Sequence, residues 1–155
     1  MMAAHNRIMA DYNVVLNCWK DVEADYAGYG GKVLTRLFQK YPQTKKLFPK
    51  FKDIPTSDLE GNAAVGAQGA IVLRKLGKLL EAKGDRTKIR ELLDTSQANT
   101  HKIDLGSFKL ITKVLVEVMV KKAHLDKAKQ GALERVMDHL IDVIALYYEE
   151  IGFDG

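Results

Sequence analysis

The sequence has few of the residues that form covalent cross-links or metal sites. Its 155 residues contain one cysteine, Cys18, and four histidines, so no intramolecular disulfide can form. The histidines are far apart, and neither an HExxH nor a CxxC motif is present, which argues against a prebuilt zinc site. A phosphate-binding GxxxxGKS/T loop and a GxSxG nucleophile motif are also absent. We therefore expect no metal site and no enzyme activity.

Long apolar runs and concentrated charge are absent too. The longest uncharged stretch, residues 61–73, is shorter than the roughly 20 apolar residues that span a membrane. Lysine and arginine number 24, aspartate and glutamate 20, and the formal net charge is +4. The basic residues have acidic neighbours and form no stripe of the kind that binds nucleic acid. Since the first residues also lack the apolar core of a signal peptide, we expect a cytoplasmic protein that binds neither membrane nor nucleic acid.

Proline is confined to one part of the chain. The three prolines are Pro42, Pro49 and Pro55, and the rest of the sequence is free of this helix-breaking residue. Elsewhere, apolar residues recur at intervals of three and four, which is the spacing of one helix face. Such faces comprise Val15, Trp19, Val22 and Tyr26; Phe108, Ile111, Leu115, Val118 and Met119; and Leu133, Val136, Met137, Leu140 and Ile144. Because no alternating stretch predicts a strand, we expect an all-α fold of seven or eight helices.

The length of the chain predicts a single domain, and the residues around Met9 predict a short extension before it. A chain of 155 residues is close to the common domain size. Met9 resembles a natural start, and Asp11 suits the N-cap of a first helix. We therefore expect residues 1–8 to be a disordered extension, from a vector or an upstream start codon, and residues 9–155 to form the domain. A capping box at residues 57–60 predicts a further short helix there.

Several longer segments match a known family. They are Val22-Glu23-Ala24-Asp25-Tyr26, Val33-Leu34-Thr35-Arg36-Leu37-Phe38, Lys46-Leu47-Phe48-Pro49-Lys50-Phe51, Val72-Leu73-Arg74-Lys75-Leu76-Gly77, His101-Lys102-Ile103 and Phe108-Lys109-Leu110-Ile111. With them the chain resembles the globin family, and within it the globins that store oxygen in muscle, over residues 9–155. The resemblance implies a monomer with eight helices, A to H, arranged three over three. It also implies a close helix crossing at Gly30 and Gly69, which only positions without a side chain permit.

The resemblance further implies a haem pocket in which both histidines are replaced. In the family, a histidine on helix F ligates the iron and another on helix E faces the bound oxygen. The matching positions here are Gln97 and Gln68. An amide oxygen is a poor ligand for haem iron, whereas an imidazole anchors the cofactor. The other pocket positions implied by the resemblance are Phe48, Val72, Leu93, His101 and Ile103.

Two interpretations follow. The first is a haem-free globin that cannot store oxygen by the usual mechanism. Its two glutamines would face one cavity, which closes by movement of helix F around Gln97 or accepts a small apolar guest. The second is a haem-binding oxygen-storage globin with altered axial ligation through His101, about one helical turn from Gln97. A designed exchange of two histidines alone is disfavoured, because Asp94 also departs from the family pattern.

Overall fold

All regular structure in the described part of the chain is helical. The computed structural model describes residues 2–96 and 104–152. They form the α-helices α1 (Met2–Ala24), α2 (Tyr26–Lys40), α3 (Ala63–Glu81), α4 (Arg86–Ser96), α5 (Leu105–Lys122) and α6 (Lys127–Glu150). Three short 3-10 helices join α2 to α3, namely η1 (Pro42–Leu47), η2 (Pro49–Phe51) and η3 (Thr56–Asp58). The predicted all-α fold is confirmed.

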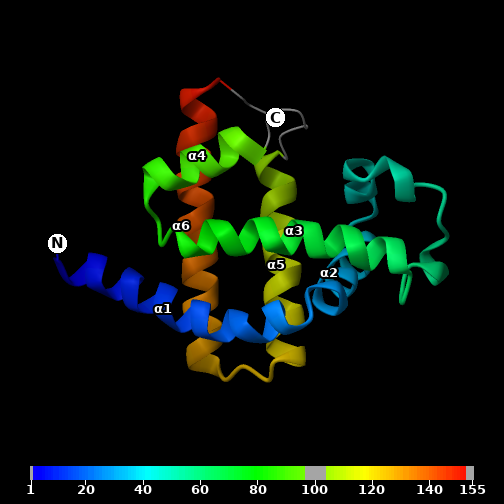
Figure 1. The fold of residues 1–155 in the computed structure, drawn as a ribbon, viewed down its shortest axis with the longest axis horizontal. Coiled ribbons are helices and arrows are strands. Elements are labelled where there is room, and N and C mark those ends of the chain that lie inside the picture. The colour runs from blue at the N-terminus through cyan, green and yellow to red at the C-terminus, as the bar shows by residue number, and fades with distance from the viewer. Residues whose placement is uncertain (1, 97–103, 153–155) are drawn as a thin grey trace.

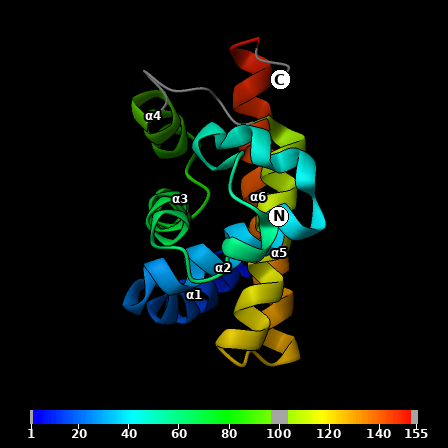
Figure 2. The same ribbon diagram turned by 90° about the vertical axis from the view of Figure 1, so that its right-hand side faces the viewer.

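The helices cross steeply in two layers. Figure 1 shows α5 and α6 running side by side, with α3 crossing both of them and α4 crossing α6 further along. Figure 2, from the side, shows that α3 and α4 lie together on one side of the α5–α6 pair. None of the described helices is long and apolar enough to cross a membrane.

The connection from α2 to α3 contains three 3-10 helices, where the capping box at residues 57–60 predicted one short helix. Proline stands at the first position of both η1 and η2. Proline lacks an N–H and clashes with the preceding turn inside a helix, so closely spaced prolines favour short, tight turns. The capping box expected at residues 57–60 does not form, because no side chain caps η3. Instead, the Asn62 side chain accepts hydrogen bonds from the amides of Ala64 and Val65 and starts α3.

The first helix begins earlier than the sequence suggested. Residues 2–8, expected as a disordered extension, are helical and continuous with the rest of α1. No proline or glycine interrupts α1, and Ile8 packs against the core. Asp11, expected as an N-cap, lies inside the helix and is only 7% exposed. Its carboxylate accepts hydrogen bonds from Nε and Nη2 of Arg135 on α6, at 2.8 and 3.0 Å, and so ties α1 to α6.

The core is shared among five helices. Trp19, Leu34, Leu73, Leu115 and Leu133 come from α1, α2, α3, α5 and α6 in turn, and each is at most 1% exposed. Burial of one such side chain contributes about 1.5–3 kcal/mol relative to exposure. These five helices are therefore packed against one another without a contribution from α4.

The closest approach of two helices is at Gly30 on α2 and Gly69 on α3. A Cβ built on Gly30 would lie 2.2 Å from the carbonyl carbon of Gly69, and one on Gly69 would lie 2.2 Å from the carbonyl carbon of Gly30. No side chain fits in that space, so the predicted glycine crossing is confirmed. It brings the backbones of α2 and α3 into direct contact.

We predict that Gly30→Ala and Gly69→Ala each lower the free energy of unfolding by about 1–3 kcal/mol or more, because the added methyl would force the helices apart. Gly66→Ala is the matched control on the same helix, since its Cβ would meet its nearest neighbour, the Ala27 carbonyl oxygen, at an ordinary 3.4 Å. We expect that control to change stability by no more than about 1 kcal/mol. Urea unfolding measures all three, and equal losses in the three variants would contradict the crossing.

Candidate functional site

Phe48 lies in an aromatic cluster at the corner between α2 and α3. It sits between η1 and η2 and is 7% exposed. Its ring centroid lies 5.7 Å from that of Phe38 and 6.2 Å from that of Phe51, spacings typical of attractive aromatic pairs. The sequence-predicted pocket residue Phe48 is thus buried and held in one orientation by two other rings.

The α3 side of the candidate pocket carries Gln68 and Val72. They are four residues apart, so they share one face of α3, and both are half-buried. Val72 packs against the core cluster. The amide of Gln68 forms no hydrogen bond with any residue that the structure describes, although an amide can both donate and accept. Within the described part of the chain, Gln68 thus presents a polar group without a hydrogen-bond partner at the edge of the core.

The α4 side carries Leu93, which is 3% exposed, one turn from the fully buried Ile89. These two side chains are the apolar anchors of α4 in the core cluster. The predicted burial of Leu93 agrees with the structure. Leu92 packs partly buried beside Ile89 and Leu93, so α4 has a small apolar face and polar contacts add to its attachment.

Two polar contacts join α4 to α6, and the sequence analysis predicted neither. The Tyr147 hydroxyl donates a hydrogen bond to Oδ1 of Asp94. One helical turn before Asp94, Arg90 forms an ion pair with Glu150. From the sequence, Asp94 stands out only as a residue that differs from the pattern implied by the family resemblance. In the structure it is a hydrogen-bond acceptor that connects α4 to a buried tyrosine of α6.

Three of the predicted pocket residues lie outside the described residues. They are Gln97, His101 and Ile103. The expected contact between Gln68 and Gln97, the expected closure of helix F around Gln97 and the alternative ligand His101 therefore stay predictions. The described part of the candidate pocket consists of Phe48, Gln68, Val72 and Leu93.

The described histidines lie away from these residues. His5 is exposed on α1, and His124 is exposed in the connection between α5 and α6. Nδ1 of His139, on α6, is hydrogen-bonded to the hydroxyl of Tyr12 on α1 at 3.0 Å. The described residues of the candidate pocket thus offer apolar side chains and one amide, and the segment with Gln97 and His101 lies outside the described residues.

The all-α fold and the glycine crossing indicate the class of protein, and comparison with known proteins agrees. The globin family model matches residues 31–144, and the chain belongs to the globin family. It is 58% identical to the myoglobins of Cyprinus carpio and Danio rerio over 147 residues, which is 95% of this chain and the whole of each relative. It is 50% identical to the myoglobin of Sarda chiliensis over the same length. The chain is a myoglobin-like globin, and the likeness to bony-fish myoglobins that its motifs suggest is confirmed.

The contact between α4 and α6 depends on the protonation of Tyr147. Burial, followed by the hydrogen bond to Asp94 and its negative charge, raises the pKa of Tyr147 from 10.0 to about 12. Burial alone raises the pKa of Tyr12 to about 12 as well. Both shifts mean that the folded protein favours the neutral phenol, and only the neutral phenol of Tyr147 can donate to Asp94.

We predict that stability falls at alkaline pH and that Tyr147 is responsible for part of the fall. Because its folded pKa is above the unfolded value, its stabilisation is fully present below about pH 10 and is lost as the pH rises through about 12. Urea unfolding between these limits should give a shallower slope with pH in Tyr147→Phe than in the wild type. Tyr12→Phe should reduce the slope as a separate contribution. Identical slopes in the wild type and Tyr147→Phe would contradict the assignment.

We also predict that Tyr147→Phe and Asp94→Ala loosen α4 without unfolding the rest of the domain. A hydrogen bond to a charged group contributes about 1.5–3 kcal/mol, so exchange of α4 backbone amides should accelerate roughly tenfold or more. Hydrogen exchange read by mass spectrometry over residues 86–96 measures this. Asp94→Asn keeps an acceptor oxygen and should lie between the wild type and Asp94→Ala.

A matched control for Tyr147→Phe is Tyr41→Phe. The Tyr41 hydroxyl is half-buried and bonds to none of the residues that the structure describes. Exchange over α4 should be unchanged in this variant. Acceleration of α4 in both variants alike would mean that loss of any phenol, and not the bond to Asp94, explains the effect.

Proposed function

We propose that this myoglobin-like globin keeps its fold without haem and does not store oxygen through a proximal imidazole. The observation that carries the proposal is the donor set of the pocket. The position that the resemblance assigns to the iron ligand is Gln97, the position facing the bound gas is Gln68, and the described histidines lie elsewhere. A neutral amide gives an iron no strong axial bond.

The attachment of α4 supports this proposal. A cofactor that binds only the folded state stabilises that state by mass action, and a globin without it must hold its helices by other contacts. Here α4 is attached through the hydrogen bond between Asp94 and Tyr147, the ion pair between Arg90 and Glu150, and the buried Leu93. These contacts belong to the protein alone and need no bond from α4 to a metal.

Three of the positions that the resemblance assigns to the pocket are apolar in the structure, which supports our expectation that the pocket acts as a binding site for a small apolar guest. Phe48 and Leu93 are buried and Val72 is half-buried, and none of the three brings a polar atom. Apolar cavities in proteins stay dry and take up apolar molecules of matching size. Gln68, at the edge, could donate its amide N–H to a guest that carries an acceptor.

A second candidate function is haem-based oxygen storage with altered axial ligation. Two observations favour it, namely the burial of Phe48 and Leu93 and the 58% identity to proteins named myoglobin. In this case His101 would take the place of the missing ligand. Apolar burial would hold a porphyrin in the pocket, and the histidine would set the chemistry of its iron.

The visible absorption spectrum of the purified protein, before and after addition of haemin, separates the two candidates. For a haem-free globin we expect no Soret band of a histidine-ligated haem in either sample. The variant Gln97→His should then gain such a band and bind oxygen reversibly, which shows that the walls of the pocket are intact. Far-UV circular dichroism of both proteins checks that the helices are unchanged.

The variant His101→Ala tests the second candidate. A ligated-haem spectrum in the wild type that is lost in His101→Ala would establish ligation through His101 and overturn the haem-free proposal. A ligated spectrum that survives in His101→Ala would contradict both candidates, since neither provides another strong ligand near Gln97.

A further inference from the structure

A groove runs along the face of the molecule that α5 and α6 form, and it ends against α2. Its volume is ≈ 1070 Å³. The floor includes Val116, Met137 and Ile141, which are buried by the packing of α5 on α6, and the half-buried Val120. None of the residues that line the groove is a position of the candidate pocket. A molecule in this groove would therefore bind independently of anything that the candidate pocket holds.

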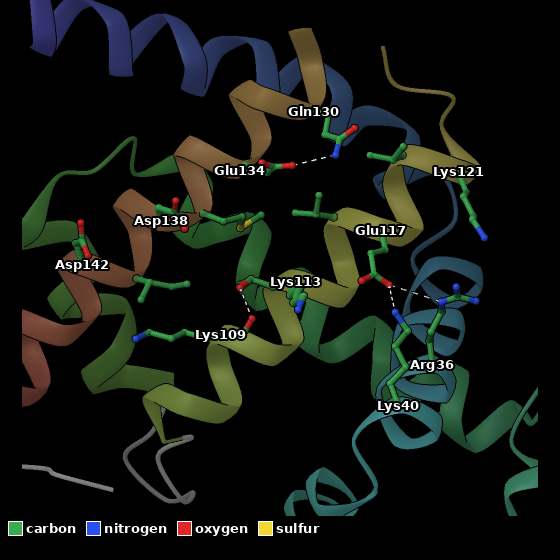
Figure 3. A pocket seen from close by; sticks show the side chains of 15 residues that line it. Arg36, Lys40, Lys109, Lys113, Glu117, Lys121, Gln130, Glu134, Asp138 and Asp142 are labelled. Carbon is green, nitrogen blue, oxygen red and sulfur yellow. Dashed lines mark hydrogen bonds and ion pairs between the residues drawn. The ribbon is translucent and has the colours of Figure 1, made fainter. Parts of the chain in front are cut away.

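One half of the groove has a basic side and an acidic side. Lys109 and Lys113 lie about one helical turn apart on α5, and Asp138 and Asp142 lie about one turn apart on α6. Figure 3 shows the two lysines on one side of the groove and the two aspartates on the other. We call these four residues the open half of the groove.

The four charges of the open half are unpaired in the described part of the chain. All four side chains are exposed, and none forms an ion pair with any residue that the structure describes. Exposed side chains without an ion pair do not have to give up a contact before they meet a new one. The open half is therefore available to a partner.

The carboxylates of the other half are already engaged. Glu117 on α5 bonds to Lys40 at 2.8 Å and lies 3.9 Å from Arg36. Glu134 on α6 accepts a hydrogen bond from Gln130 at 3.0 Å. Figure 3 shows both sets of contacts. Since Glu117 interrupts the lysines of α5, the α5 side of the groove is uniformly basic only in the open half.

The charges of the groove restrict what it can bind. A single small ion would be attracted by one side of the open half and repelled by the other. A second copy of this chain is no better, because its own Glu117 would face Glu134 when its lysines met the aspartates. The occupant must carry acidic groups on one flank and basic groups on the other, spaced like the open half at about 6 Å.

An amphipathic helix of another protein meets these requirements. Residues four apart on a helix form a row along one flank, with the same spacing as the rows of the open half. Between its two flanks such a helix can present a narrow apolar stripe to the floor of the groove. Because that floor is already largely buried, small apolar residues such as alanine suit the stripe, and the flanking charges select the partner.

We propose that the α5–α6 groove binds an amphipathic helix of a partner protein. The acidic flank of that helix lies against Lys109 and Lys113, and its basic flank lies against Asp138 and Asp142. Three helices then pack side by side, as in a helix bundle. The affinity depends mainly on exposed charges, so binding is weak and decreases as ionic strength rises. The chain itself stays the monomer that the family resemblance implies.

A pair of synthetic peptides tests the proposal. The first is an alanine-rich helix of about 20 residues, long enough to be helical in water, with glutamates along one flank and lysines along the other. The second has the same composition, but glutamate and lysine alternate along each flank. Fluorescence anisotropy of labelled peptide, titrated with protein to about 1 mM, measures the Kd.

We expect saturable binding of the first peptide at low ionic strength, with a Kd at least about tenfold higher in 0.5 M salt. The second peptide should bind at least about tenfold more weakly, because each of its flanks meets like charges as well as opposite ones. Absence of binding by the first peptide, or equal binding of the two, would overturn the proposal. So would sedimentation velocity that shows a dimer of the chain in place of a one-to-one complex.

Charge reversal and its rescue give the sharper test. Lys109→Glu with Lys113→Glu makes both sides of the open half acidic, so the first peptide should lose binding. Adding Asp138→Lys and Asp142→Lys exchanges the two sides, and a helix turned end for end then presents each flank to an opposite charge. The quadruple variant should therefore regain the affinity of the wild type. Retained binding in the double variant, or no recovery in a folded quadruple variant, would contradict the proposed contact.

The matched control is Lys75→Glu with Lys78→Glu, two exposed lysines of α3 that do not line the groove. It changes the net charge of the chain as much as the double lysine variant of the groove does. It should bind the first peptide like the wild type, which separates recognition by the open half from a general effect of net charge. Circular dichroism and thermal unfolding of all variants check that each is folded.

Discussion

The contact of two glycine backbones determines where the candidate pocket lies. Gly30 and Gly69 bring α2 and α3 so close that no side chain fits between them. The position of α3 along α2 is therefore fixed, and with it Gln68, the residue immediately before Gly69. Residues 41–62, with their three short 3-10 helices, connect the two helices. They place Phe48 against Phe38 and Phe51. One close crossing thus places two of the positions that the resemblance assigns to the candidate pocket, Gln68 and Phe48.

The α4 side of the candidate pocket depends on a different kind of contact. Among the α4 side chains that the structure describes, Ile89 and Leu93 are buried and Leu92 packs partly buried against the core. The two buried side chains contribute about 3–6 kcal/mol, which is little against the loss of the helix's conformational freedom. The bond from Tyr147 to Asp94 and the ion pair of Arg90 with Glu150 add directional contacts to α6. An exposed ion pair contributes little, so the hydrogen bond that reaches a buried phenol matters more. Asp94, which the family resemblance singled out, makes this contact.

Much of the fold could be predicted from the sequence, because apolar spacing reports directly on buried helix faces. Val15, Trp19 and Val22 are buried as that spacing indicated. Local signals were less reliable where two of them compete. The capping box predicted at residues 57–60 does not form, since this segment is a 3-10 helix and Asn62 caps the next helix instead. Asp11 does not cap a helix, because its carboxylate pairs with Arg135 on α6. In the pocket, Phe48 and Leu93 were predicted from their family positions. The Asp94–Tyr147 bond joins residues 53 apart in sequence, and no local pattern reports such a pair.

The charged faces of α5 and α6 show the same limit of sequence reasoning. The four-residue spacing of Lys109 and Lys113, and of Asp138 and Asp142, is visible in the sequence, where it describes two ordinary solvated helix faces. Only the packing of α5 on α6 places these side chains on the two sides of one groove (Figure 3). Exposed opposite charges gain little from each other, since water and salt screen them. The arrangement of these charges is thus a consequence of the helix packing and contributes little to it.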